Sequence, residues 1–256
     1  MSTWTRSKNP MSRDIQSDEV RSRVVAAAFQ LFIEKGYEDA TIRQISERSG
    51  VSSGSIYHFF SDKEGVFQHL TLQVFETTLE VAEHGAAGHK DAYLILALKW
   101  AYLVRLFSAD KRMAELFSVA YRSWKISQEL LRVATSRHRK LLGTVLADWN
   151  EDQFFIATLQ LGGVLSALVD ERVNLDSLNE EKRIRALLST ALHAFGVEPD
   201  KIQGLIQKAI KLLPPITELA AGLGAGDLNL RGPVVDGVAR RQPGKLAGVN
   251  SPKSAR

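Results

Sequence analysis

Residues 21–67 constrain the fold most, because three short helical patterns follow one another there with only tight turns between them. In the first pattern, apolar residues recur three and four positions apart, which places them in one stripe along a helix. Gly36 follows this pattern at a place where a left-handed residue commonly ends a helix. The stripe consists of Val24, Ala27, Ala28, Leu31 and Phe32.

The second and third patterns are shorter and have clear start signals. Thr41 and Ser52 are residue types that cap helix N-termini, and Asp62 is suited to cap a fourth helix. The second helix should end at Ser49-Gly50. Two helices joined by a short turn that contains glycine form a helix-turn-helix, whose second helix fits the major groove of DNA. The inward positions are Ile42 and Ile45 in one helix and Ile56 and Phe60 in the next.

This stretch resembles the N-terminal DNA-binding domain of the tetracycline-repressor (TetR) family of bacterial regulators. The matching runs are AAAFQLFIEKGYEDATIRQIS, SGVSSGSIYHFF and SDKEGVF, so about fifty consecutive residues fit without a gap. Three positions depart from the family pattern. Ser53 stands where lysine is common, Phe59 where histidine is common, and Gly65 where a better helix former is usual. The first departure removes an expected phosphate contact.

The resemblance implies an all-α fold in which a three-helix DNA-binding domain is joined to a larger helical domain for effector binding and dimerisation. We expect a flexible N-terminal arm at residues 1–17, the helix-turn-helix domain at 18–66, and the effector-binding and dimerisation domain at 67–215. Residues 216–256 should form a disordered basic tail, because glycine and proline are frequent there and the positive charge is concentrated there.

Nine residues of the motif are candidates for DNA contact. Hydroxyl groups on the second helix of the motif can bond to base edges or phosphates, and glycine lets the backbone approach the DNA closely. By resemblance, Tyr57 and Lys63 hold phosphates, which fixes register without reading sequence. The alternatives are a half-buried core aromatic for Tyr57 and a solvated charge for Lys63. The full set is Thr41, Arg43, Ser52, Ser53, Gly54, Ser55, Tyr57, His58 and Lys63.

The distribution of charge does not itself indicate DNA binding. Residues 1–70 hold nine basic and nine acidic residues, residues 71–221 hold eighteen of each, and residues 222–256 hold six and two, which accounts for the net charge of +4. The DNA-binding hypothesis therefore rests on the motif. Because one neutral head should bind weakly, we expect a homodimer on a partly palindromic, double-stranded DNA operator.

Several other classes of protein lack a signal in the sequence. The chain has no cysteine, and its six histidines are scattered, so we expect no metal site and no cofactor. No nucleophile elbow or phosphate loop occurs, so an enzyme is not expected. The chain has no uninterrupted apolar run of about 20 residues and no secretory signal. We therefore expect a cytoplasmic protein without a membrane partner.

Seven further helical patterns follow the motif, at about residues 64–84, 91–107, 111–124, 127–149, 154–173, 178–195 and 199–213. By resemblance, the helices at 154–173 and 178–195 pair with their copies in a second subunit. The first of these carries Gly162, Gly163, Ser166 and Ala167, which suit a close approach of helices. The alternative is a core helix of a monomer.

The resemblance also implies that a small effector binds among the body's helices. An aromatic lining would suit a hydrophobic or amphipathic effector, and Arg105 or Arg122 could meet an acidic group on it. The alternative for each aromatic candidate is that it packs in the hydrophobic core and does not contact a ligand. The candidates are Trp100, Tyr102, Phe107, Phe117, Tyr121, Trp124, Phe154 and Phe155.

These observations predict a one-component transcriptional regulator. The resemblance favours a repressor that an effector releases from DNA, and activation stays open. The alternative is a helical ligand- or partner-binding protein whose head binds DNA weakly or has lost that role, given the neutral head and Ser53.

Overall fold

The computed structural model describes residues 10–213 except residues 87 and 171. The described part is entirely helical, which confirms the predicted all-α class. The tail predicted for residues 216–256 lies outside the described residues. The helices are α1 (Pro10–Lys35), α2 (Ile42–Ser49), α3 (Ser53–Phe60), α4 (Lys63–Gly85), α5 (Ala92–Ala109), α6 (Lys111–Arg122), α7 (Trp124–Leu142), α8 (Glu151–Val169), α9 (Glu180–Ala194) and α10 (Pro199–Leu212).

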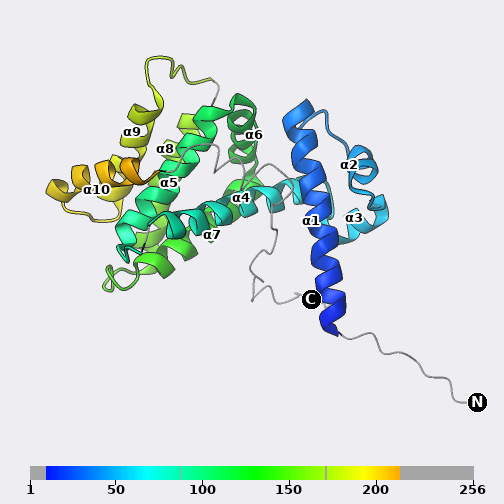
Figure 1. Ribbon diagram of the computed structural model, residues 1–256, viewed down its shortest axis with the longest axis horizontal. Coiled ribbons are helices and arrows are strands. Elements are labelled where there is room, and N and C mark those ends of the chain that lie inside the picture. The colour runs from blue at the N-terminus through cyan, green and yellow to red at the C-terminus, as the bar shows by residue number, and fades with distance from the viewer. Residues whose placement is uncertain (1–9, 87, 171, 214–256) are drawn as a thin grey trace, which may run out of the picture.

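Helices α1, α2 and α3 form a small group at one end of the molecule, which we call the head (Figure 1). Thr41 and Gln44 form a reciprocal capping box at the start of α2, with distances of 3.3 Å and 3.0 Å. Gly36 and Gly50 have φ angles of 85° and 67°, so both helix ends use the left-handed conformation that glycine adopts most easily. The predicted caps and stops are thus confirmed.

The first helix is longer than expected. It begins at Pro10, so residues 10–17 of the predicted flexible arm are helical, and residues 1–9 lie outside the described part. Proline is favoured in the first turn of a helix, where its missing N–H has no intrahelical partner to lose. The polar composition of the arm therefore did not prevent the helix from extending through it.

A sharp turn joins α3 to α4. Ser61 has φ 65° and ψ −48°, and the Asp62 N–H donates to the Phe60 carbonyl oxygen at 2.7 Å. A Cβ atom on Gly65 would lie 1.8 Å from that same carbonyl oxygen. This close approach gives the physical reason for glycine in the first turn of α4, where a better helix former was expected.

Helix α4 belongs to both parts of the molecule. Near its start, the Phe67 ring lies 5.5 Å from the ring of Phe32 and 4.7 Å from that of Tyr37. Farther along, α4 packs against α5 and α7. The domain boundary expected between residues 66 and 67 therefore falls within a continuous helix (Figure 1).

Helices α5 to α10 form the larger part, which we call the body. Helix α5 is its central element and packs against α4, α6, α7, α8, α9 and α10. Both α5 and α8 are long and apolar enough to cross a membrane by length and composition, although a core helix passes the same test. In α5, 67% of the apolar segment is buried inside the body, as in a core helix. In α8, 33% of the corresponding segment is buried.

The body's helices occupy the predicted regions, with one clear difference. The long helix expected at about 127–149 begins earlier, at Trp124, because Ser123 caps it and accepts from the Ile126 N–H at 3.2 Å. It ends at Leu142. A turn follows at residues 143–148, and α8 begins after a capping box formed by Asn150 and Gln153.

Helix α8 buries only one of its faces. Phe154, Leu161 and Leu165 face the core, with at most 1% of each residue exposed. On the other face, Phe155, Ile156 and Leu159 are 42%, 53% and 51% exposed. We call these three residues, with the neighbouring glycines at 162 and 163, the outer face of α8.

Candidate functional site

The second helix of the motif, α3, has one buried and one exposed face. Ile56 and Phe60 are buried against the head's core, whereas Gly54, Tyr57 and His58 are exposed. Tyr57 is 53% exposed, which argues against its alternative interpretation as a half-buried core aromatic. Helix α3 therefore presents a polar and aromatic face that another molecule can reach.

The serine hydroxyls at the start of α3 interact with one another. The Ser52 oxygen accepts from the Ser55 N–H at 3.2 Å and lies 2.9 Å from the Ser55 hydroxyl. Ser53 is half-buried, and Thr41 is exposed while its oxygen caps α2. The Thr41 oxygen has a second lone pair that can still accept a hydrogen bond, and the Ser52 oxygen has one when its own hydroxyl donates to Ser55.

Two arginines of α2 pair with acidic neighbours. The Arg43 side chain is 88% exposed at the start of α2, and its Nε lies 2.9 Å from Glu47, one turn later. Both terminal nitrogens of Arg48 donate to Glu34 at 2.7 Å, which holds the pKa of that carboxyl group below its ordinary value. Glu47 occupies the Nε–H of Arg43, and the two terminal NH2 groups of the guanidinium can still donate to a phosphate or a base.

Lys63 is fixed in place by the loop between α1 and α2. Its ammonium group donates to the carbonyl oxygens of Tyr37 at 2.8 Å and Glu38 at 3.1 Å, and it lies 4.3 Å from the centroid of the Tyr37 ring. Burial raises the pKa of the Tyr37 hydroxyl to about 12, and the Glu64 carboxylate acts in the same direction. Because an ammonium group has three protons, one N–H stays free of these two bonds.

Phe59, which stands where the family pattern commonly has histidine, lies under the side chain of Arg21. The Arg21 guanidinium lies 5.1 Å from the centroid of the Phe59 ring and 2.9 Å from Asp18. Phe59 therefore supplies the ring of a cation–π contact between α3 and α1. Pattern reasoning at single positions missed this contact, because it joins residues from two different helices.

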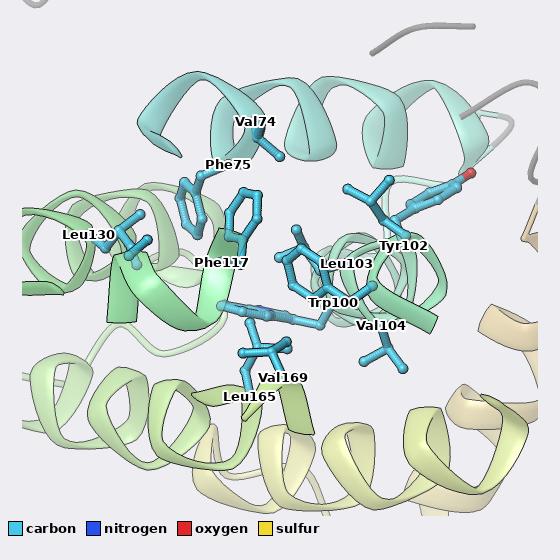
Figure 2. Packing of buried hydrophobic residues seen from close by; sticks show 14 of the residues in the cluster. Val74, Phe75, Trp100, Tyr102, Leu103, Val104, Phe117, Leu130, Leu165 and Val169 are labelled. Atoms are coloured by element: carbon cyan, nitrogen blue, oxygen red, sulfur yellow. The ribbon is translucent and has the colours of Figure 1, made fainter. Parts of the chain in front are cut away.

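The structure divides the predicted effector-pocket residues into two groups. Trp100, Tyr102, Phe107, Phe117 and Phe154 are buried. Figure 2 shows Trp100 and Phe117 pointing into the same region, together with Phe75 from α4, whereas the hydroxyl end of Tyr102 points elsewhere. The Phe107 and Phe117 rings pack 4.6 Å apart.

The remaining pocket candidates do not join this interior group. Trp124 is 77% exposed at the start of α7, and Phe155 belongs to the outer face of α8. Tyr121 is half-buried, and burial raises the pKa of its hydroxyl. Arg105 donates to Glu180 at 2.8 Å and to the Leu213 carbonyl, so it joins α5 to α9 and the end of α10.

Two buried ionisable residues were not among the predicted site residues. Lys99 is 1% exposed, and its ammonium group lies 3.2 Å from the centroid of the Phe75 ring and 5.4 Å from that of Trp100. His138 is 1% exposed, and its Nδ1 lies 2.8 Å from the Thr158 hydroxyl. Burial holds the pKa of both groups well below its ordinary value.

The sequence contained a signal for one of these residues. Lys99 is the one charged residue in the apolar run LILALKWAYLV. His138 lies in the basic run RHRK, which resembles a solvated helix face. That interpretation holds for the exposed Arg139 and Lys140 but is wrong for His138. Within the described residues, no three histidine, aspartate or glutamate side chains come together as a metal site would require.

Comparison with known proteins adds a family match in the head. The family described as "Bacterial regulatory proteins, tetR family" matches residues 24–70. The HTH-type transcriptional repressor AcnR of Corynebacterium diphtheriae is 42% identical over 66 residues, which cover 25% of this chain and 35% of AcnR. The HTH-type transcriptional repressor BepR of Brucella suis is 27% identical over 133 residues, which cover 52% of this chain and 63% of BepR.

Solved structures resemble the fold over a longer stretch. RolR in complex with resorcinol matches with a TM-score of 0.59 at 21% identity, and the match covers 80% of this chain and all of that chain. A putative TetR-family regulator from Syntrophomonas wolfei matches with a TM-score of 0.53 at 22% identity, covering 72% of this chain and 99% of that chain. At this identity the likeness concerns the fold of the head and body together.

Proposed function

Residues 24–70 belong to the tetR family of bacterial regulatory proteins, and on that premise we propose that the whole chain is a DNA-binding transcriptional regulator. The observation that carries the proposal is the arrangement of α3. This helix buries Ile56 and Phe60 and exposes Gly54, Tyr57 and His58 on its opposite face. A second helix of a helix-turn-helix with such a face fits the major groove.

The predicted DNA contacts can be divided by their chemistry. Tyr57 and the free N–H of Lys63 are suited to phosphates, which hold the head in register. Arg43 and His58 are exposed and have side chains that can bond to base edges. Ser52, Ser53 and Ser55 lie at the N-terminus of α3, where hydroxyl and backbone N–H groups can approach a phosphate. Gly54, which has no side chain, leaves room for a phosphate to approach α3. Thr41 is at the N-terminus of α2, as Ser52 is at that of α3.

Repression is the direction of regulation that we propose, because the relatives AcnR and BepR are both described as repressors. The matched segment of AcnR is only about a third of that protein, so this inference rests on the head. Binding to an operator near a promoter would exclude the transcription machinery. We place the protein in the cytoplasm, where bacterial DNA is accessible.

We propose that the protein acts as a homodimer through α8 and α9. The outer face of α8 exposes Phe155, Ile156 and Leu159 side by side, next to two glycines without side chains. Contiguous exposed apolar side chains of this kind mark interaction surfaces. A second copy of α8 would cover this face and place two heads on one DNA duplex, as a palindromic operator requires.

A small-molecule effector bound in the body completes the proposed regulator. An effector can lower DNA affinity only if it binds one arrangement of the body better than another. Helix α4 is continuous from the head to the body's aromatic interior, so a change there would reach the head through one rigid element. Phe75 on α4 contacts that interior directly.

The experiment that tests this function is selection of DNA fragments by the purified chain at near-physiological salt. Sheared genomic DNA of the source organism would be incubated with the protein, and bound fragments would be sequenced. Enrichment of a short inverted repeat is the expected result. A folded protein that enriches no sequence, and whose residual binding shows no salt dependence, would contradict the proposal.

A further inference from the structure

The body contains buried hydrogen-bonding atoms that have no hydrogen-bond partner among the described residues. They include Nζ of Lys99, Nε1 of Trp100 and Nε2 of His138. Each of these three residues is at most 2% exposed. A buried polar atom without a partner is costly, so such atoms are few in folded proteins and each needs an explanation, such as a bound water, ion or ligand. Three of them in neighbouring side chains therefore call for a specific explanation.

The three side chains form one cluster, which we call the Lys99 cluster. Trp100 links its members, because its ring centroid lies 5.4 Å from the Lys99 ammonium nitrogen and 5.7 Å from the His138 ring centroid. Lys99 is also close enough to His138 for its charge to lower the pKa of the imidazole further. The cluster thus joins α5 and α7 in the aromatic interior of the body.

The hydrogen bonds around His138 fix what its free nitrogen can do. The Thr158 hydroxyl donates its only proton to the Phe154 carbonyl oxygen at 2.7 Å. His138 Nδ1 must therefore donate to the Thr158 oxygen, 2.8 Å away. Burial keeps the imidazole neutral, so its Nε2 carries no proton and is an acceptor. The cluster consequently offers two donors, on Lys99 and Trp100, and one acceptor, on His138.

Burial lowers the pKa of Lys99, and its charged form has no counter-charge of its own. Glu76 is the acidic group that acts on Lys99, but it is already held by Arg137 through two contacts of 2.9 Å. With Lys99 protonated, these three side chains sum to a charge of +1. A buried charge without a counter-charge is unfavourable, and one negative group at this place would balance it.

Aromatic rings bound the cluster. The Phe75 ring covers the Lys99 ammonium group and lies 6.1 Å from the Trp100 ring, and Figure 2 shows the Phe117 ring beside that of Phe75. A flat ligand could stack among these rings, whereas a bulky or strongly polar one would lose favourable contact with them. Such a ligand would compete with the Phe75 ring of α4 for contact with the Lys99 ammonium group.

We propose that the Lys99 cluster is the effector site and that its ligand is a small aromatic acid that also carries a hydroxyl group. The acid group would accept from Lys99 and Trp100, the hydroxyl group would donate to His138 Nε2, and the ring would lie among Phe75, Trp100 and Phe117. This inference rests on the proposed function only in that it assigns the ligand a regulatory role. The site itself does not depend on DNA binding.

The binding test uses the purified full chain and defined compounds. The acids are 3-hydroxybenzoate, 4-hydroxybenzoate and 6-hydroxy-2-naphthoate, and each is paired with its neutral amide. Calorimetric titration should show binding of at least one acid, with its amide about tenfold weaker or worse, because only the acid can form a charge-assisted bond to Lys99. Benzoate, which lacks the hydroxyl group, should bind several-fold more weakly than the hydroxybenzoates.

A matched pair of variants locates the site. Lys99→Met removes the ammonium group but keeps an unbranched chain of similar length, and should make the acid bind no better than its amide. Lys140→Met changes an exposed lysine on α7 and should bind like the unaltered protein. If Lys99→Met does not fold, the comparison of acid and amide binding to the unaltered protein still tests the proposed site. Binding of none of the acids, equal binding of acid and amide, or acid binding unchanged in a folded Lys99→Met protein would overturn the proposal.

Failure of this site can be separated from failure of the proposed function. If the DNA selection yields an operator and no acid binds, the regulator stands and this site is wrong. If an acid binds through Lys99 and no operator is found, the site stands and the DNA-binding function is wrong. If both hold, the acid should lower operator affinity in the unaltered protein and leave it unchanged in the Lys99→Met variant.

Discussion

The ammonium group of Lys63 lies 2.8 Å from the carbonyl oxygen of Tyr37 and over the ring of the same residue. The first residue of α4 therefore holds the loop that leads from α1 into α2. That loop positions Thr41 and the start of α2, so Lys63 has a structural role in addition to its predicted contact with phosphate. The two roles have different experimental signatures.

Replacing Lys63 by methionine should weaken DNA binding and loosen this loop. Because phosphate contacts carry no sequence information, affinity should fall by a similar factor on operator and non-operator duplexes. Amide hydrogen exchange at residues 36–40 should become faster, since two bonds to their carbonyl groups are lost. Arg43→Ala and His58→Ala are the comparison, and these should change the preference among sites. A change of sequence preference in the Lys63 variant would contradict this division of roles.

Glu47→Gln should strengthen DNA binding. Glu47 holds the exposed Arg43 side chain at 2.9 Å, and its charge would face the phosphates when the head is on DNA. The variant frees Arg43 and removes a repulsive charge, so affinity should rise about two- to fivefold, with a steeper dependence on salt. Glu80→Gln, on the exposed surface of α4, is the control. An unchanged affinity for the Glu47 variant would contradict this effect of Glu47 on DNA binding.

Gly54 in α3 and Gly65 in the first turn of α4 should respond in opposite ways to alanine. A Cβ atom at Gly65 would lie 1.8 Å from the Phe60 carbonyl oxygen, so Gly65→Ala should destabilise the head by about 1–3 kcal/mol or more. At Gly54 the nearest atom to a new Cβ is 4.0 Å away, so Gly54→Ala should keep its thermal stability and lose DNA affinity instead. Thermal unfolding and DNA titration of both variants separate the two effects. Equal melting temperatures would contradict the contact at Gly65.

Much of the head could be predicted from the sequence because its determinants are local. Caps such as Thr41 and Ser52, and the left-handed Gly36 and Gly50, act within a few residues of their position, and each is found where the pattern placed it. The helices of the body were predicted for the same reason. The end of α7 at Leu142 was not, since the apolar pattern continues through the turn that follows.

The interior cluster could not be predicted because its contacts join distant parts of the chain. His138 bonds to Thr158 on the next helix, and Arg137 pairs with Glu76 at a separation of 61 residues. Whether a histidine in a basic run faces solvent or core depends on which helices pack on either side of it. Local periodicity does not contain that information.

The stability of the protein should depend on pH through His138. Burial, aided by the Lys99 charge, lowers the pKa of His138 in the folded protein, whereas the unfolded chain takes up this proton near pH 6.5. The unfolded state therefore binds more protons, and stability should fall as pH drops below about 6.5, by up to about 1.4 kcal/mol per pH unit. Chemical denaturation from about pH 7.5 to about pH 5.5 should show a flatter profile for His138→Gln than for the control His193→Gln. Parallel profiles would contradict a buried neutral imidazole.

A single charge on the outer face of α8 should separate the proposed dimer. In a dimer, Ile156→Glu or Leu159→Glu would bury a carboxylate between apolar helices without a partner, which is strongly unfavourable. Sedimentation at micromolar concentration should show a monomer for either variant and a dimer for the unaltered chain. Gln203→Glu, exposed on α10, should stay dimeric. Dimers of unchanged stability in both α8 variants would place the subunit contact elsewhere.

The continuity of α4 across the head and the body also fixes their relative rotation. Its 23 residues form one unbroken helix from Lys63 to Gly85, about 34 Å long. Inserting or deleting one residue in its middle would turn the head by about 100° about the helix axis relative to the body. Hybrid proteins that join this head to another body should therefore work only when the junction in α4 preserves the helical phase. Sensor domains could then be exchanged among such proteins as long as that angular register is kept.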